Sequence, residues 1–120
     1  MRYKLIVAGA ALVLAAPAFA DAWDFVLTND TGKDIKTIEL SATGADKWQP
    51  NKIDTTIQKG DPIKAGGRTT VHFDKDAQCK WDVKLTFTDA STQTWSGINL
   101  CDDSFVTLHL KNGAPTFNGS

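Results

Sequence analysis

The sequence predicts an all-β protein: an antiparallel β-sandwich of the immunoglobulin or C2 kind, with six or seven strands. Three observations lead to this prediction. Short segments alternate between apolar and polar residues, clusters of turn-forming residues separate them, and no helical period appears after residue 20. Two cysteines bracket the most regular pair of segments, which is typical of a small exported domain.

That pair of segments lies between residues 79 and 101. Apolar residues alternate with polar ones at Trp81, Val83, Leu85 and Phe87, the pattern of a strand with one buried face. Turn-forming residues 89–92 follow, and residues 93–100 return. The segment is therefore predicted to be a β-hairpin.

A hairpin symmetric about Ala90 predicts three cross-strand pairs: Leu85 with Trp95, Val83 with Gly97 and Cys79 with Cys101. The two sulfurs would then lie opposite each other on one face, close enough to bond. We predict a Cys79–Cys101 disulfide, which in the chain-entropy model stabilises the fold by about 3 kcal/mol.

The first 20 residues have the parts of a secretory signal peptide. Arg2 and Lys4 precede the apolar residues 5–16, and Ala18-Phe19-Ala20 forms a small-residue cleavage site. Cleavage after Ala20 predicts a mature domain of residues 21–120 in the periplasm or outside the cell. No second apolar run follows, so no integral membrane segment is expected after cleavage.

The charge of the mature chain argues against a nucleic-acid partner. Removing Arg2 and Lys4 from the 13 basic residues leaves 11, against 14 acidic residues, a net charge of −3. A nucleic-acid surface needs a basic face. All the acidic residues except Glu39 are Asp, which favours turns and strand ends, as expected for a β protein with many loops.

Four further strands are predicted from alternation, at residues 23–28, 35–41, 68–73 and 104–110. The first two are expected to form a hairpin across the turn at 29–32, with a bulge near Lys36–Thr37 that brings the apolar residues into phase. Residues 43–67 are irregular, and 53–58 fit either a short strand or one helical turn. A flexible tail is expected from about residue 112.

A set of spaced residues gives the chain a resemblance. In order they are Phe25, Leu27, Asn29, Thr31-Gly32, Ile35, Ile38, Trp48, Cys79, Trp81-Asp82, Phe87, Asp89, Trp95 and Asn99-Leu100-Cys101. With them the chain resembles a group of small exported bacterial β-domains of unknown function. Proteins of this appearance are sometimes labelled argininosuccinate lyase, but enzymes of that name are large helical oligomers with active sites shared between subunits. The resemblance therefore implies a fold and a compartment, and no activity.

The sequence offers no catalytic set. It has no G-x-S-x-G motif, and both cysteines are expected in the disulfide. The two histidines, His72 and His109, each stand between apolar neighbours of a strand, so both are expected on a sheet face. His72 shares a face with Asp74, a pairing too common to indicate a catalytic base. We expect a protein that is not an enzyme.

Two pairs of aspartates suggest a metal site. Asp74 and Asp76 precede Cys79, and Asp102 and Asp103 follow Cys101, so the disulfide would bring them to one end of the sandwich. Carboxylates from flexible loops are the ligands that Ca²⁺ prefers. The alternative is a solvated acidic rim that keeps the domain soluble.

Trp48 lies in the irregular region, where it would either close the end of the core or offer a contact to a partner. The functional hypothesis is a non-enzymatic exported module that binds a protein or a glycan. The alternatives are a Ca²⁺-dependent binding domain that uses the four aspartates, and an inhibitor of an exported hydrolase.

Overall fold

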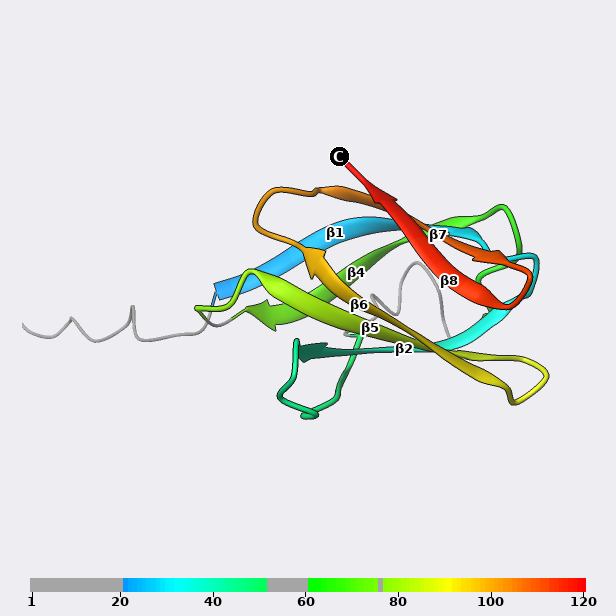
Figure 1. Ribbon diagram of the computed structural model, residues 1–120, viewed down its shortest axis with the longest axis horizontal. Coiled ribbons are helices and arrows are strands. Elements are labelled where there is room, and N and C mark those ends of the chain that lie inside the picture. Colours follow the sequence, from blue (N-terminus) through cyan, green and yellow to red (C-terminus); the bar gives the residue numbers. More distant parts are fainter. Residues whose placement is uncertain (1–20, 52–60, 76) are drawn as a thin grey trace, which may run out of the picture.

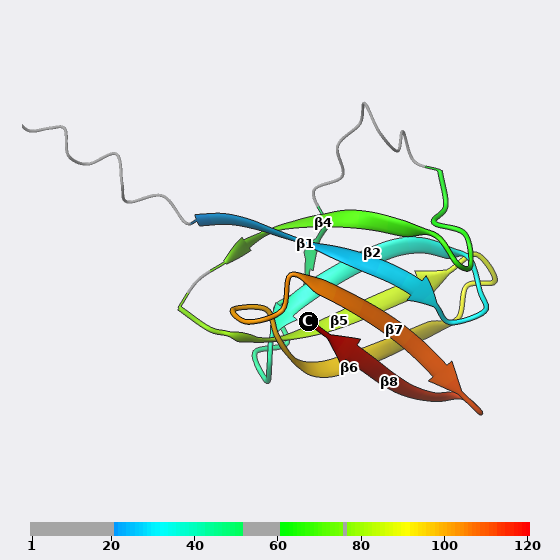
Figure 2. The same cartoon turned by 90° about the horizontal axis from the view of Figure 1, so that it is seen from above.

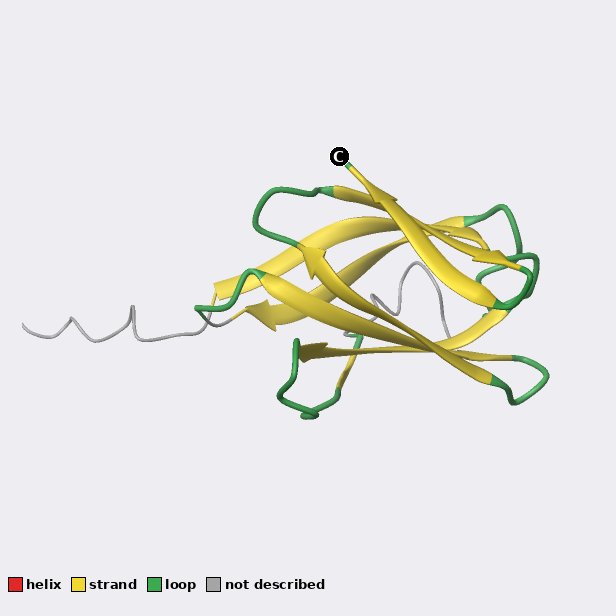
Figure 3. Ribbon diagram, in the orientation of Figure 1, coloured by secondary structure: helices red, strands yellow, loops and turns green. Residues whose placement is uncertain are grey.

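The computed structural model describes residues 21–51, 61–75 and 77–120, and the regular elements in these ranges are all strands (Figure 3). Eight strands form two four-stranded sheets. Figures 1 and 2 show them as two packed layers, so the predicted all-β sandwich is confirmed. The strands are β1 (Asp21–Asp30), β2 (Ile35–Ala42), β3 (Gln49–Pro50), β4 (Arg68–Lys75), β5 (Lys80–Phe87), β6 (Thr92–Asn99), β7 (Phe105–Lys111) and β8 (Ala114–Gly119).

The first sheet has the order β4-β1-β7-β8 and the second the order β3-β2-β5-β6. The pairing of β1 with β7 is parallel, and the other pairings of the named strands are antiparallel. The sandwich is thus antiparallel except at the centre of the first sheet, where the middle strands come from opposite ends of the domain (Figure 1).

The predicted hairpin of the first two strands is wrong, because β1 and β2 lie in different sheets. The turn between them is a corner built on Asn29, which is fully buried. Its amide donates to the carbonyls of Lys33 at 2.7 Å and Ile63 at 3.1 Å, and its Oδ1 accepts from the Thr31 hydroxyl at 2.6 Å. These bonds replace the ladder that a hairpin would have. The predicted bulge is confirmed by a register shift between Ile35 and Thr37.

The β5–β6 hairpin is confirmed, but two of its predicted pairs are wrong. Val83 pairs with Trp95, and Leu85 with Gln93. The turn is centred near Asp89 and not on Ala90, because the Phe87 carbonyl accepts from the Ala90 N–H and the Phe87 N–H donates to the Ser91 carbonyl, both at 2.9 Å. Relative to the predicted pairing, β6 is displaced along β5 by two residues. Because a displacement by an even number keeps each side chain on the same face, Trp95 still faces the core.

Ala90 closes this turn with a positive φ of 74°. That conformation costs a residue with a Cβ about 1–2 kcal/mol, whereas glycine adopts it freely. Ala90→Gly is therefore expected to raise the free energy of unfolding by about 0.5–1 kcal/mol, after allowance for the greater freedom of glycine in the unfolded chain. Urea unfolding of the two proteins checks this, with Ala45→Gly as a control in another turn; an unchanged or lower midpoint for Ala90→Gly would contradict it.

A bulge in β6 brings the cysteines together. The register shifts between Trp81 and Val83, and Gly97 has a φ of 76°. The Gly97 N–H donates to Oδ1 of Asp82 at 3.1 Å. Beyond the bulge the strands converge on the disulfide, with the Cα atoms of Cys79 and Cys101 5.1 Å apart. The predicted disulfide is confirmed.

The core lies between the sheets. Trp81 and Trp95 belong to it, as predicted, and the ring of Trp81 meets that of Phe73 edge-on at 5.0 Å between centroids. Apolar side chains from β1, β2, β4, β5, β6 and β7, with Ile63 and Leu100 from the connections, fill the layer: Phe25, Leu27, Ile35, Ile38, Leu40, Ile63, Val71, Phe73, Trp81, Val83, Leu85, Phe87, Trp95, Ile98, Leu100, Val106 and Leu108.

Side chains bridge the sheets at both open sides of the sandwich. On one side the Gln49 amide makes two bonds to the backbone of Asp74 in β4, at 3.1 and 3.2 Å, and Oδ1 of Asn51 accepts from the His72 N–H at 2.8 Å. On the other side the Trp95 indole N–H donates to the carbonyls of Thr116 at 2.9 Å and His109 at 3.2 Å. Both sets of bonds join the sheets where no backbone ladder does. The bonds of Gln49 and Asn51 also cover the edge strand β4.

The expected flexible tail contains a strand. Residues 114–119 form β8, paired with β7 along its length. The sequence signal is weak because β8 is exposed on both faces except at the half-buried Phe117. Residues 53–58, where the sequence fits either a strand or a helical turn, lie outside the described residues.

Candidate functional site

The four aspartates of the predicted calcium site do not all converge. Asp102 accepts the Asn99 amide at 3.1 Å, and the carboxylate of Asp103 lies directly against Gly119, in the space that a Cβ would take. Asp74 is at the end of β4, and Asp76 lies outside the described residues. Within the described ranges, no three His, Cys, Asp or Glu side chains form a group that could hold a metal ion.

Because Asp102 bonds to Asn99 and Asp103 lies against Gly119, we expect Ca²⁺ to leave the midpoint of thermal unfolding unchanged relative to a chelator. A ligand that binds only the native state would raise that midpoint. Melting curves in millimolar Ca²⁺ and in chelator test this, with Mg²⁺ as the ionic-strength control. A midpoint raised by Ca²⁺ alone would contradict it and would indicate that Asp76 completes a site.

Trp48 lies half-buried just before β3, against the outer side of the second sheet. The Lys84 ammonium is 4.6 Å from the centroid of its ring, and its indole N–H donates to Oδ1 of Asp46 at 3.3 Å. Glu39 contacts the same ammonium at 3.7 Å. Lys84 thus already occupies one side of the Trp48 ring, so less of the ring is free to contact a partner molecule.

The opposite surface of the molecule carries a more open aromatic residue. We call it the outer face: the residues of β1, β4, β7 and β8 that point away from the core. Phe105, in β7, is 55% exposed and is the one exposed large hydrophobic side chain among residues 24–51, 61–74 and 77–120. It pairs with the half-buried Val26 of β1, so the two form a small apolar patch on a flat sheet.

Further along the same strands, three side chains form a hydrogen-bonded chain across the outer face. Nδ1 of His109 lies 2.8 Å from Oδ2 of Asp30, and Nε2 lies 3.1 Å from Nδ2 of Asn118. The residues come from β7, β1 and β8, and the parallel pairing sets Asp30 beside His109. Asp30 remains 63% exposed, whereas His109 is 19% exposed. The imidazole therefore fixes a carboxylate and an amide at the surface.

A second Asp–His pair lies on the other half of the outer face. Nδ1 of His72 in β4 is 3.8 Å from Oδ2 of Asp24 in β1, its cross-strand partner. Both histidines thus lie on a sheet face as the sequence predicted, and His72 contacts Asp24. This longer pair is also more open, because the His72 side chain is 37% exposed.

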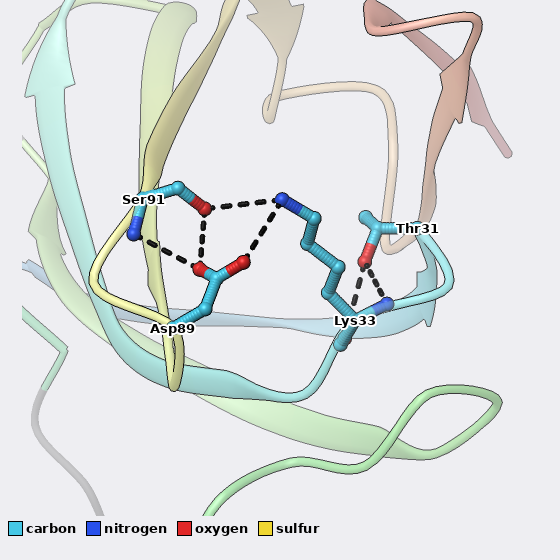
Figure 4. Close-up of polar contacts among 4 residues, drawn as sticks. All are labelled: Thr31, Lys33, Asp89 and Ser91. Atoms are coloured by element: carbon cyan, nitrogen blue, oxygen red, sulfur yellow. Dashed lines mark hydrogen bonds and ion pairs between the residues drawn. The ribbon is translucent and has the colours of Figure 1, made fainter.

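The turns at one end of the sandwich are joined by a polar cluster (Figure 4). The Lys33 ammonium contacts Oγ of Ser91 at 3.1 Å and Oδ2 of Asp89 at 3.2 Å. Oδ1 of Asp89 accepts from the hydroxyl and the backbone N–H of Ser91, at 2.5 and 3.0 Å. These Ser91 bonds, with a smaller effect of Lys33, lower the pKa of Asp89 from 3.8 to about 2. The cluster ties the β5–β6 turn to the β1–β2 corner.

This pKa predicts how the turn responds to acid. Because folding lowers the pKa of Asp89, its contribution to stability is present above pH 3.8 and is lost as the pH falls through about 2. Ser91→Ala, which removes the hydroxyl donor, is expected to raise the Asp89 pKa toward its ordinary value. An NMR titration of the carboxyl carbon measures this, with Ser104→Ala as the control; an unchanged pKa in Ser91→Ala would contradict it.

The hydrogen bonds and ion pairs of these groups are mostly with one another and with neighbouring side chains. The ring of His72 contacts Asp24, and the ring of His109 contacts Asp30 and Asn118. Ser91 contacts the exposed ammonium of Lys33, which Asp89 also holds. Both cysteines are in the disulfide.

Comparisons with known proteins bear on the fold alone. No protein-family model and no curated protein sequence matches the chain. A solved structure described as the "NMR structure of the protein from Eubacterium rectale" is similar, with a TM-score of 0.54 and 18% identity over 82% of this chain and 87% of that one. The chain is thus similar in fold to a bacterial β-domain.

The structure also bears on the compartment. Disulfides persist in oxidising surroundings, so the Cys79–Cys101 bond indicates a location outside the cytoplasm. In the stretches that the structure covers, no helix is long and apolar enough to cross a membrane.

Proposed function

We propose that the mature domain is a non-enzymatic exported module that binds its partner through the outer face. The observation that carries this proposal is Phe105, a large apolar side chain that is 55% exposed at the start of β7, an inner strand of the first sheet. Aromatic residues are enriched at the centres of binding interfaces, where polar residues form the rim.

The export route is part of the proposal. The signal-peptide pattern of residues 1–20 supports secretion with cleavage after Ala20, to the periplasm or the extracellular space. The disulfide supports the same compartment, because disulfides form and persist in oxidising surroundings. In this setting the domain would meet cell-surface polymers or other exported proteins.

Binding is favoured over catalysis by what the polar side chains do. Asp30, His109 and Asn118 satisfy one another across three strands, and the Lys33–Asp89–Ser91 cluster joins two turns. Both sets are built to hold positions. A surface whose side chains are already ordered loses little entropy when a partner arrives.

The test separates binding from turnover. Purified residues 21–120 are assayed on ester, peptide and glycan panels, and we expect no turnover that a single substitution abolishes. In parallel, the accessibility of Phe105 is followed by NMR on addition of candidate partners, and we expect a partner to protect it. Turnover that is lost in His109→Gln with the fold intact would overturn the proposal.

A further inference from the structure

We infer that the outer face binds an uncharged oligosaccharide that lies along β1 and β7. Phe105 would stack on one sugar ring, and Asp30, His109 and Asn118 would hydrogen-bond to the hydroxyls of another. This inference rests on the proposed binding function and names the chemical class of the partner.

The spacing of the two contact points sets the size of the ligand. Phe105 and His109 are four residues apart in β7, which at the rise of a strand is about 13 Å. Between them lie Thr107 and its parallel neighbour Thr28, both half-buried on the same face. A single sugar ring cannot reach both ends, whereas an extended oligosaccharide can, with the threonine hydroxyls under its middle.

The side chains match the two kinds of surface that a sugar offers. The C–H groups on one side of a sugar ring pack on an aromatic ring, and its hydroxyls both donate and accept hydrogen bonds. Phe105 supplies the ring, the Asp30 carboxylate supplies acceptors, and the Asn118 amide supplies both roles. The His109 bonds of 2.8 and 3.1 Å hold the last two in place before a ligand arrives.

The charge of the outer face selects an uncharged partner. The outer face has two basic residues, Arg68 and Lys111, and three aspartates, Asp24, Asp30 and Asp74. Asp24 and Asp30 each contact a histidine. The charges thus nearly balance, and no field of one sign is present to attract a polyanion or a polycation.

A protein partner fits this face less well than a sugar. The core of a protein–protein interface is rich in large apolar residues. Among residues 24–51, 61–74 and 77–120 Phe105 is the one exposed large hydrophobic side chain, and Thr107, the next residue of β7 on this face, is polar. One aromatic residue among hydroxyls, amides and carboxylates is closer to a sugar-binding surface.

The test uses purified residues 21–120 and a panel of uncharged hexasaccharides: β-1,4-linked glucose, N-acetylglucosamine and mannose, and α-1,4-linked glucose. We expect calorimetry to detect at least one of them at millimolar ligand. Phe105→Ala and Asn118→Ala should each weaken that binding about tenfold or more, and Phe105→Trp should retain it. Thr37→Ala, exposed on the other sheet, is the matched control and should leave binding unchanged. Because Phe105 and Asn118 are exposed, all variants should keep the wild-type melting midpoint.

Three results would overturn the inference: no binding to any member of the panel, binding that Phe105→Ala leaves unchanged, or stronger binding of the matching uronic-acid hexasaccharide. Binding of a charged glycan or of a protein through Phe105 would contradict the inference of an uncharged sugar, but would agree with the proposed binding function. Turnover, by contrast, would remove the binding function itself.

Discussion

Replacing Trp95 with alanine is expected to lower the free energy of unfolding by about 3–5 kcal/mol, the range for removing a large aromatic side chain from a core. Trp95 is 1% exposed, so its removal leaves a cavity between the sheets. The substitution also removes the indole N–H that joins β6 to the carbonyls of His109 and Thr116, at the side of the sandwich where no ladder connects the sheets. Urea unfolding followed by far-UV circular dichroism measures the loss.

Two further variants separate the contributions. Trp95→Phe keeps an aromatic ring and loses the N–H, so it should cost less, about 1–3 kcal/mol. Trp48→Ala removes the same side chain from a half-exposed position and should cost only about 1 kcal/mol. If Trp95→Ala unfolded at the same denaturant concentration as Trp48→Ala, Trp95 would not be the bridge between the sheets that we describe.

The second large effect is expected from the disulfide. The double variant Cys79→Ala, Cys101→Ala should lose about 3 kcal/mol, because the bond closes a loop with a sequence separation of 22 and so restricts the unfolded chain. Urea unfolding of the wild type with and without reductant should give the same difference.

The double variant should still fold, because the core between the sheets remains complete. The reductant should leave the double variant itself unaffected, which makes that protein its own control. A loss well below 1 kcal/mol would contradict the role assigned to the bond.

The strands themselves follow from local alternation. A period of two in residues 81–87 requires one buried face, and the structure buries Trp81, Val83, Leu85 and Phe87 as that pattern demands. The cysteine pair follows from the same hairpin. The bulge near Lys36 could also be placed, because Ile35 and Ile38 cannot share a face in a regular strand.

The arrangement of strands into sheets depends on contacts that are distant in the sequence. The turn after β1 has the composition of a hairpin turn, yet Asn29 uses its side chain to make a corner with Ile63. Nothing local distinguishes these two uses of asparagine. The parallel pairing of β1 with β7 could not be predicted for the same reason, because it joins strands that are distant in the sequence. The strand β8 could not be predicted because it is exposed on both sides and its alternation is weak.

The candidate site was missed for the same reason. In the alternation of β7, Phe105 falls on the face opposite to that of Val106. The sequence therefore places the Phe105 side chain away from the core. Its exposure depends on whether another element covers that face, which is a tertiary fact. The contact of His109 with Asp30 needs the parallel pairing, and its contact with Asn118 needs β8. The aspartates around the disulfide gave a clear local signal, but Asp102 bonds to Asn99 and Asp103 lies against Gly119, and the described residues hold no group of three acidic side chains there.

We propose that this domain is exported, is closed by the Cys79–Cys101 disulfide and binds its ligand on the outer face of the first sheet. The most direct measurement is mass spectrometry of the intact protein taken from its producing cells and alkylated without reduction. We predict a chain that begins at Asp21 and takes up no alkylating agent until it is reduced, after which two cysteines react. A chain that keeps residues 1–20 and is alkylated at both cysteines without reduction would contradict the account.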